Sequence, residues 1–182
     1  MLVGLAHASG HAQTIEDKAL ICEACHGGAN GAPPQQSFPV PIIFGQNLGY
    51  LFFQLRDFKS VARKNEQMAL VVGPMDPKDF MPLAQYFSKK PWPNLEQAHP
   101  AADVAAIAQR VNASVVCTSC HQEGFKGDST QPRLAGQVEG YLQKTMTDFA
   151  SGARGNNPGM TGFMKGLTAQ EIAAMAAWLA GM

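Results

Sequence analysis

Residues 22–26 read Cys-Glu-Ala-Cys-His, and residues 117–121 read Cys-Thr-Ser-Cys-His. Each stretch has the C-x-x-C-H pattern by which a haem c is attached to a protein chain. Two thiols about one helical turn apart can each form a thioether with a haem vinyl group, and the adjacent imidazole can bind the iron. The chain has four cysteines, and all lie in these two stretches. The sequence therefore predicts two covalently bound haem c groups, with thioethers and iron ligands from Cys22, Cys25, His26, Cys117, Cys120 and His121.

Two other kinds of site use C-x-x-C pairs: zinc sites and thioredoxin-like redox sites. A four-cysteine zinc site usually places its pairs much closer together than Cys25 and Cys117. A thioredoxin-like pair belongs in a βαβ unit, and no such pattern is visible. The histidine directly after both second cysteines favours haem.

The composition is that of a globular protein with few charges and no net charge. Hydrophobic residues make up 46% of the 182 residues and charged residues 15%, with 14 Lys and Arg against 14 Asp and Glu. The length allows two small domains, each built around one haem. No basic stripe is present, so nucleic acid is not expected as a partner. No apolar run reaches eighteen residues, so no transmembrane segment is predicted; peripheral contact with a membrane stays open.

Residues 1–12 resemble the end of a secretory signal. Residues 6–8 and 10–12 offer small-residue cleavage sites, but a basic region is lacking and the apolar stretch is short. We interpret this segment as a remnant of an export signal, with a disordered leader as the alternative. Since bacterial c-type haems are attached after translocation, the expected location is the periplasm.

An internal repeat divides the chain into two halves. Gly-Gln-x-x-Gly-Tyr-Leu at residues 45–51 recurs 91 residues later at 136–142. The repeat predicts two homologous domains, residues 13–88 and 101–182. Residues 89–100, with three prolines, are predicted to form a semi-stiff linker.

Hydrophobic spacing and capping residues predict three helices in each half and no strands, so the fold class is all-α. The stretch 62–75 is predicted to be irregular. Three of the predicted helices cover residues 48–61, 101–111 and 138–149. The other three begin at Thr14, Asp76 and Thr168.

The second axial ligand of each iron is predicted from the repeat. The histidines outside the two motifs are not matched between the halves, so a second histidine on both irons is not expected. Met68 and Met160 are matched, 92 residues apart, each eight residues before a predicted helix cap. We interpret them as ligands lying in loops, with Met75, Met81 and Met164 as alternatives that otherwise pack in the core. An iron with both axial positions filled passes electrons but has no open position for a substrate.

Two further matched pairs have two readings each. Pro41 and Pro132 each lie four residues before the glycine of Gly-Gln, where a carbonyl could accept the Nδ1 proton of the ligand histidine, or where the chain could simply turn. Tyr50 and Tyr141 could bond a haem propionate or could be core aromatics.

Basic residues leave a similar choice. Arg63 and the matched Arg154 could offset propionate charge or could be solvated. The cluster of Arg56, Lys59, Arg63 and Lys64 could be a docking patch, although a helix face of this kind is more often solvated.

Taken together, these features resemble the dihaem cytochromes c4, over about residues 14–182. The resemblance rests on both C-x-x-C-H stretches, Pro-x-x-x-Gly-Gln at 41–46 and 132–137, Tyr-Leu at 50–51 and 141–142, Gln-Leu-x-Asp-Phe at 54–58, and the stretches around Met68 and Met160. It implies two class I cytochrome c domains related by a pseudo-twofold axis, with haem propionate edges close together. It also implies the ligand pairs His26 with Met68 and His121 with Met160, supported by the carbonyls of Pro41 and Pro132. The short proline-rich linker and the balanced charge depart from the family pattern.

The resemblance implies a periplasmic electron carrier, not an enzyme, which transfers single electrons between respiratory partners such as a terminal oxidase, a bc1-type complex or a dehydrogenase. One alternative is a cytochrome subunit that accepts electrons from a flavin- or quinone-dependent dehydrogenase. A haem enzyme would require an open iron position, and the matched methionines argue against it.

Overall fold

The computed structural model describes residues 13–27 and 39–182. The predicted export-signal remnant, residues 1–12, and most of the loop after the first haem motif lie outside the described residues. The described part of the chain is helical, and its only β pairing is an isolated bridge between Asp128 and Gln131. The all-α prediction is confirmed. None of the described helices is long and apolar enough to cross a membrane.

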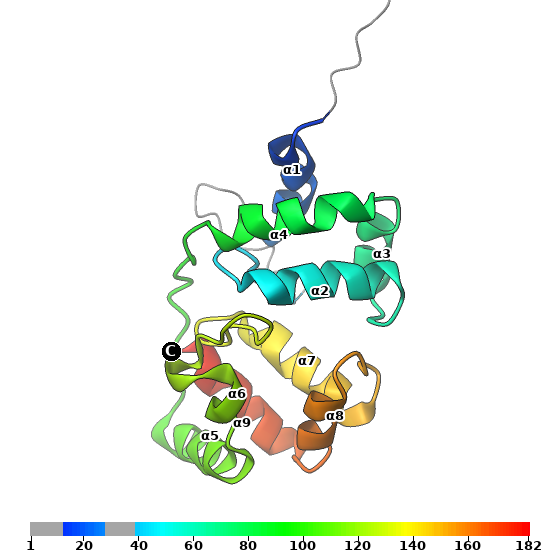
Figure 1. Cartoon of the computed structure of the whole chain (residues 1–182). Coiled ribbons are helices and arrows are strands. Elements are labelled where there is room, and N and C mark those ends of the chain that lie inside the picture. Colours follow the sequence, from blue (N-terminus) through cyan, green and yellow to red (C-terminus); the bar gives the residue numbers. More distant parts are fainter. Residues whose placement is uncertain (1–12, 28–38) are drawn as a thin grey trace, which may run out of the picture.

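The helices of the N-terminal half form the upper layer in Figure 1. Thr14 begins the first of them with a capping box, in which the Thr14 side chain accepts from Asp17 N–H and the Asp17 carboxylate accepts from Thr14 N–H. The last helix follows a 3₁₀ turn that starts with Pro77 and is capped by Asp76, and it packs against both the first and the second helix. These elements are α1 (Ile15–His26), α2 (Leu48–Lys59), α3 (Glu66–Val72), η1 (Pro77–Asp79) and α4 (Phe80–Ser88).

The helices of the C-terminal half form the lower layer. Thr168 and Glu171 make the predicted capping box, and the apolar face that follows is buried at Ile172, Met175 and Leu179. This last helix packs against the entry helix and the middle helix of its half. The elements are α5 (Ala102–Val115), α6 (Thr118–His121), η2 (Glu123–Phe125), α7 (Glu139–Ser151), α8 (Pro158–Met164) and α9 (Ala169–Ala180).

The prediction that residues 62–75 are irregular is wrong, because α3 lies within them and α8 lies at the matching place in the other half. Asn65 caps α3 by accepting a hydrogen bond from Met68 N–H, and Asn157 caps α8 by accepting one from Met160 N–H. Met68 and Met160 therefore lie in the first turns of short helices and not in loops. At seven residues each, these helices are too short to show a clear apolar period.

Helix ends also differ from the predicted bounds. The helix predicted over 48–61 ends at Lys59, just before Val61, whose φ of 63° lies in the left-handed region. The helix predicted over 101–111 continues to Val115 and breaks at Val116, with φ 55°. The second haem motif thus lies mainly in the separate α6, whereas the first lies within α1.

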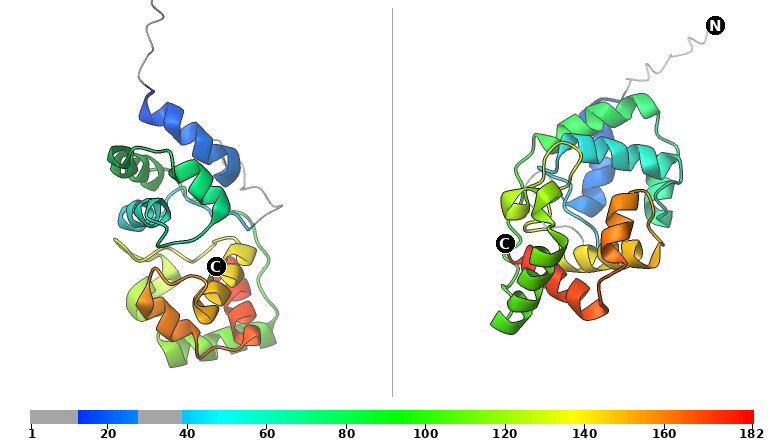
Figure 2. Two further views of the ribbon diagram at one scale, coloured as in Figure 1. Left: turned by 90° about the vertical axis from the view of Figure 1, so that its right-hand side faces the viewer. Right: turned by 60° about the horizontal axis from the view of Figure 1, so that its bottom comes forward.

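The two halves stack on each other, and the segment between them runs along one side (Figures 1 and 2). Residues 89–101 contain no helix. Trp92 in this segment packs against the core of the N-terminal half, and its ring lies 4.4 Å from the Arg133 guanidinium of the C-terminal half. The domain limits at 13–88, 89–100 and 101–182 remain a prediction.

Candidate haem sites

One large cavity, of about 1010 Å³, runs between and into the two halves. Apolar side chains from the two cores form much of its walls, among them Leu51, Phe87, Leu142 and Leu179. The cavity brings together all the predicted ligands and attachment residues, which are Cys22, Cys25, His26, Met68, Cys117, Cys120, His121 and Met160.

Both motif histidines are buried and held by a proline carbonyl. His26, at the end of α1, places Nδ1 2.7 Å from the oxygen of Pro41, and His121, at the end of α6, places Nδ1 3.0 Å from that of Pro132. A carbonyl can only accept, so Nδ1 carries the proton and Nε2 keeps its lone pair. Burial lowers the pKa of both imidazoles, and the proline carbonyls oppose it only in part. Both rings are thus neutral and oriented as metal ligands.

None of the four cysteines is in a disulfide, and all four line the cavity. Burial raises the pKa of Cys22 to about 11, and burial also raises the pKa of Cys117. A thioredoxin-like pair needs a lowered cysteine pKa, so these environments argue against redox thiol chemistry. In addition, the described residues contain no cluster of three or more His, Cys, Asp or Glu side chains fit to hold a metal ion.

Met68 and Met160 occupy equivalent positions, each three residues after a capping asparagine. Both are half-buried and line the cavity. Of the alternatives, Met75 and Met81 do not line the cavity, whereas Met164 does but is packed in the core of its half.

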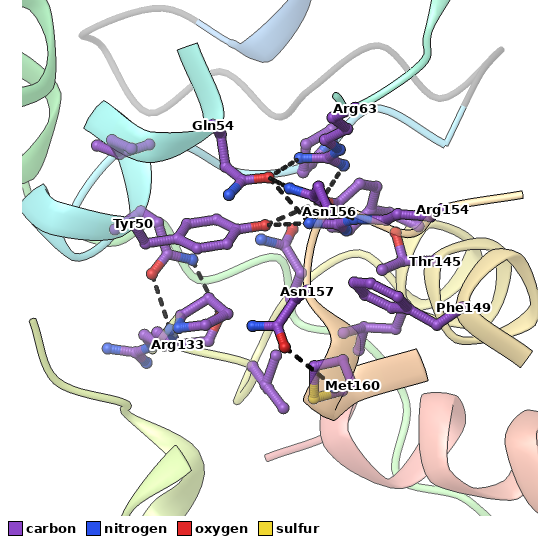
Figure 3. Close-up of a pocket in the computed structure, with 18 of the residues that line it drawn as sticks. Tyr50, Gln54, Arg63, Arg133, Thr145, Phe149, Arg154, Asn156, Asn157 and Met160 are labelled. Carbon is purple, nitrogen blue, oxygen red and sulfur yellow. Dashed lines mark hydrogen bonds between the residues drawn. The ribbon is translucent and has the colours of Figure 1, made fainter. Parts of the chain in front are cut away.

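Polar residues from both halves meet at the centre of the cavity, as Figure 3 shows. Arg63 donates from Nη2 to the Tyr141 hydroxyl over 2.9 Å, and Arg154 donates from Nη2 to the Tyr50 hydroxyl over 3.4 Å. The two hydroxyls lie 3.5 Å apart. The Gln54 Oε1 atom accepts from both guanidinium groups, at 2.8 Å from Arg63 and 2.9 Å from Arg154.

This cluster carries two positive charges whose hydrogen-bond partners are hydroxyl and amide oxygens, with no carboxylate among them. None of the ion pairs among the described residues involves Arg63 or Arg154. Burial opposes ionisation of both tyrosines and raises the pKa of Tyr50, but the charges of Arg63 and Arg154 lower the pKa of Tyr141 to about 7. Such a site favours an anion, and the carboxylate groups of a haem fit its donors.

The basic residues of the predicted patch have separate roles. Arg56 pairs with Asp57, Lys59 donates to the carbonyls of Gly73 and Met75, and Arg63 turns into the cavity. Arg63 is therefore a cavity residue, whereas Arg56, Lys59 and Lys64 are exposed, and the docking patch stays a prediction. The sequence did not predict a role for Gln54 at the cavity. The repeat places Thr145 at the matching position, so comparison of the two halves did not single out Gln54 as a site residue.

Comparison with known proteins identifies the family. Residues 101–182 match the family model described as Cytochrome c. Cytochrome c4 from Pseudomonas aeruginosa is 34% identical over 194 residues, an alignment that covers 100% of this chain and 93% of that protein. The chain belongs to the cytochrome c4 family. The crystal structure of reduced recombinant cytochrome c4 from Pseudomonas stutzeri superposes with a TM-score of 0.77 at 27% identity, covering 96% of this chain and 100% of that one.

Membership in the cytochrome c4 family confirms the prediction of a dihaem electron carrier that is not an enzyme, with two covalent haem c groups. Its histidine–methionine pairs are His26 with Met68 and His121 with Met160. A more distant relative, from Thiomonas intermedia, is named a thiosulfate dehydrogenase electron acceptor. It is 29% identical, over 90% of this chain and 79% of its own length.

Proposed function

We propose that this cytochrome c4 carries single electrons in the periplasm between respiratory redox proteins, such as a terminal oxidase, a bc1-type complex or a dehydrogenase. The observation that supports it best is that both histidine–methionine pairs open into one cavity shared by the two halves. Each bound haem supplies a one-electron iron couple. Bound by one imidazole and one thioether from this chain, each iron would have no position left for a substrate, which suits a carrier.

The residues of this chain have distinct tasks in the proposal. Cys22, Cys25, Cys117 and Cys120 form the thioethers. The carbonyls of Pro41 and Pro132 hold the imidazoles of His26 and His121 in one orientation, so that Nε2 would be free to bind the iron. Tyr50 and Tyr141, with Arg63 and Arg154, bind the haem carboxylates. The apolar walls exclude water, which favours the reduced iron because it carries less charge.

The experiment is carbon monoxide binding to the reduced dihaem protein, followed by its optical spectrum. The wild-type spectrum should not change on adding carbon monoxide. In Met68→Ala or Met160→Ala half of the haem absorbance should shift, and in the double variant all of it should. Met75→Ala and Met81→Ala are matched controls outside the cavity, and their spectra should stay unchanged.

A shift in wild-type protein, or none in Met68→Ala, would show that these methionines are not the ligands. The periplasmic location has its own check, which is the recovery of the haem-loaded protein in the periplasmic fraction of cells expressing the complete gene.

A second candidate is an electron-accepting subunit of a dehydrogenase. It is favoured by the name of the Thiomonas intermedia relative, an electron acceptor for thiosulfate dehydrogenase. Co-purification with a larger catalytic subunit at native expression levels would support this candidate over a freestanding shuttle.

A further inference from the structure

Each half of the molecule holds one backbone residue of the other half through a buried glutamine. Gln46 accepts from Arg133 N–H at 2.7 Å and donates to the Arg133 carbonyl at 3.0 Å. Gln137 does the same to Ile42, with the same two distances. Both glutamine residues are only 2% exposed, so these hydrogen bonds are shielded from water. The two contacts are reciprocal, and they cross the junction between the halves.

The backbone residue held in each case directly follows the proline that holds a haem ligand. Ile42 follows Pro41, whose carbonyl accepts from His26, and Arg133 follows Pro132, whose carbonyl accepts from His121. The carbonyl of a residue and the N–H of the next belong to one planar peptide unit. Fixing the Ile42 N–H therefore fixes the direction of the Pro41 carbonyl.

The result is a continuous chain of hydrogen bonds from one half to the ligand of the other. Gln137 Oε1 accepts from Ile42 N–H, and the same peptide unit accepts through the Pro41 oxygen from His26 Nδ1. Hydrogen bonds in such a chain polarise one another, so the Pro41 oxygen becomes a better acceptor. A better acceptor at Nδ1 makes the imidazole a more basic ligand.

Backbone groups of both halves determine the orientation of each glutamine amide. Gln46 Oε1 also accepts from Asn47 N–H, and Gln137 Oε1 from Val138 N–H, both at 2.9 Å. With two backbone N–H groups at Oε1 and a carbonyl at Nε2, each amide has one satisfied orientation. The Gly-Gln stretch of the repeat thus ties a local turn to the opposite half.

We propose that Gln46 and Gln137 are crossed positioning residues: Gln137 sets the basicity of His26, and Gln46 sets that of His121. The inference rests on the proposed ligation by these two histidines. A more basic imidazole stabilises the ferric iron, so loss of the glutamine raises the potential of the haem in the opposite half. Because the glutamine acts through a peptide unit, the expected change in the one-electron equilibrium is roughly threefold, or about 28 mV at 59 mV per tenfold.

The test uses the holoprotein with Gln46→Leu and Gln137→Leu, and follows the haem methyl NMR signals of each haem through a redox titration. The signals are assigned by their contacts to the Met68 or Met160 side chain. Gln137→Leu should raise the potential of the haem bound by His26, and Gln46→Leu that of the haem bound by His121. A shift confined to the haem of the mutated half, or equal shifts of both, would overturn the proposal.

Gln97→Leu is the matched control. Gln97 Nε2 donates to the Gln137 backbone carbonyl at 2.9 Å and Oε1 accepts from Glu139 N–H at 3.0 Å, but neither atom contacts the Pro41–Ile42 or Pro132–Arg133 peptide. Loss of the Gln97 amide should weaken the attachment of the linker to the C-terminal half and leave the reduction potentials of both haems unchanged.

If a leucine variant does not fold, Gln46→Asn and Gln137→Asn shorten the reach by one methylene group and keep a polar amide. They should give the same crossed pattern. Carbon monoxide binding separates the two proposals. If wild-type protein does not bind carbon monoxide but the glutamine variants show no crossed shift, the proposed ligation stands and only the role of the glutamines is refuted.

Discussion

Arg63 of the N-terminal half donates a hydrogen bond to the hydroxyl of Tyr141 in the C-terminal half, over 2.9 Å. The two residues are 78 positions apart in the chain. The charge of Arg63 also helps to lower the pKa of Tyr141 to about 7, against the effect of burial. The contact places a guanidinium charge at the junction of the halves, where the carboxylates of both haems are proposed to lie.

We expect Arg63→Gln to lower the mean reduction potential of the two haems. Oxidation adds a positive charge to the iron centre, and removing a nearby cation makes that charge less costly. For charges about 10 Å apart at an effective dielectric constant of about 20, the effect is roughly 1–2 kcal/mol, or tens of millivolts. Spectroelectrochemical titration measures it.

Lys89→Gln is the control for this variant, since it also removes one cation but from an exposed position in the segment between the halves. Solvent and salt screen such a charge, so its effect should be much smaller. Equal shifts in the two variants would place Arg63 outside the haem environment.

We expect Gly45→Ala to destabilise the protein more than Gly152→Ala. Both glycines have positive φ, +66° at Gly45 and +80° at Gly152, so alanine costs about 1–2 kcal/mol at either position. At Gly45 a Cβ would also lie 2.9 Å from the backbone nitrogen of Trp92, whereas at Gly152 it would meet nothing within 4 Å. Gly45→Ala should lower the free energy of unfolding by at least about 1 kcal/mol more than Gly152→Ala, which is the lower end of the cost of an overpacked site. Urea denaturation measures the free energy of unfolding of both variants. Equal losses would show that the backbone around Trp92 moves to accommodate the added Cβ at little cost.

We expect the capping box of α9 to lose its effect in acid. Two hydrogen bonds from Thr168, through its backbone N–H and its hydroxyl, lower the pKa of Glu171 below its usual 4.5. The stabilisation is therefore complete above about pH 4.5 and is lost as pH falls through the lowered folded-state pKa. Thr168→Ala should cost about 1 kcal/mol at pH 7 and less at pH 3.

Thermal unfolding followed by circular dichroism at the two pH values gives the comparison. Glu171→Gln keeps a hydrogen-bonding group at the same position but does not titrate, so its stability relative to wild type should improve as the pH falls. A pH-independent penalty in Thr168→Ala would show that the hydrogen bond from the Thr168 hydroxyl to the Glu171 carboxylate contributes nothing to the cap.

Local sequence signals accounted for the helices that have caps and a long apolar face. Thr14 with Asp17 and Thr168 with Glu171 marked two helix starts correctly, since a capping box is a contact within four residues. The helices around Met68 and Met160 were missed because seven residues give too little periodicity. The capping asparagines, Asn65 and Asn157, were visible in the sequence and would have indicated them.

The sequence by itself indicated how many haems this protein carries, and it predicted one motif histidine and one matched methionine in each half. C-x-x-C-H is a local chemical requirement, and the repeat aligns the two halves without any knowledge of their packing. Only the tertiary structure decided that Arg63 meets Tyr141, that Gln46 holds Arg133, and that Gln137 holds Ile42. Those hydrogen bonds join residues 78 to 95 positions apart, so they exist only once the two halves pack, and no local pattern encodes which face of one half meets the other.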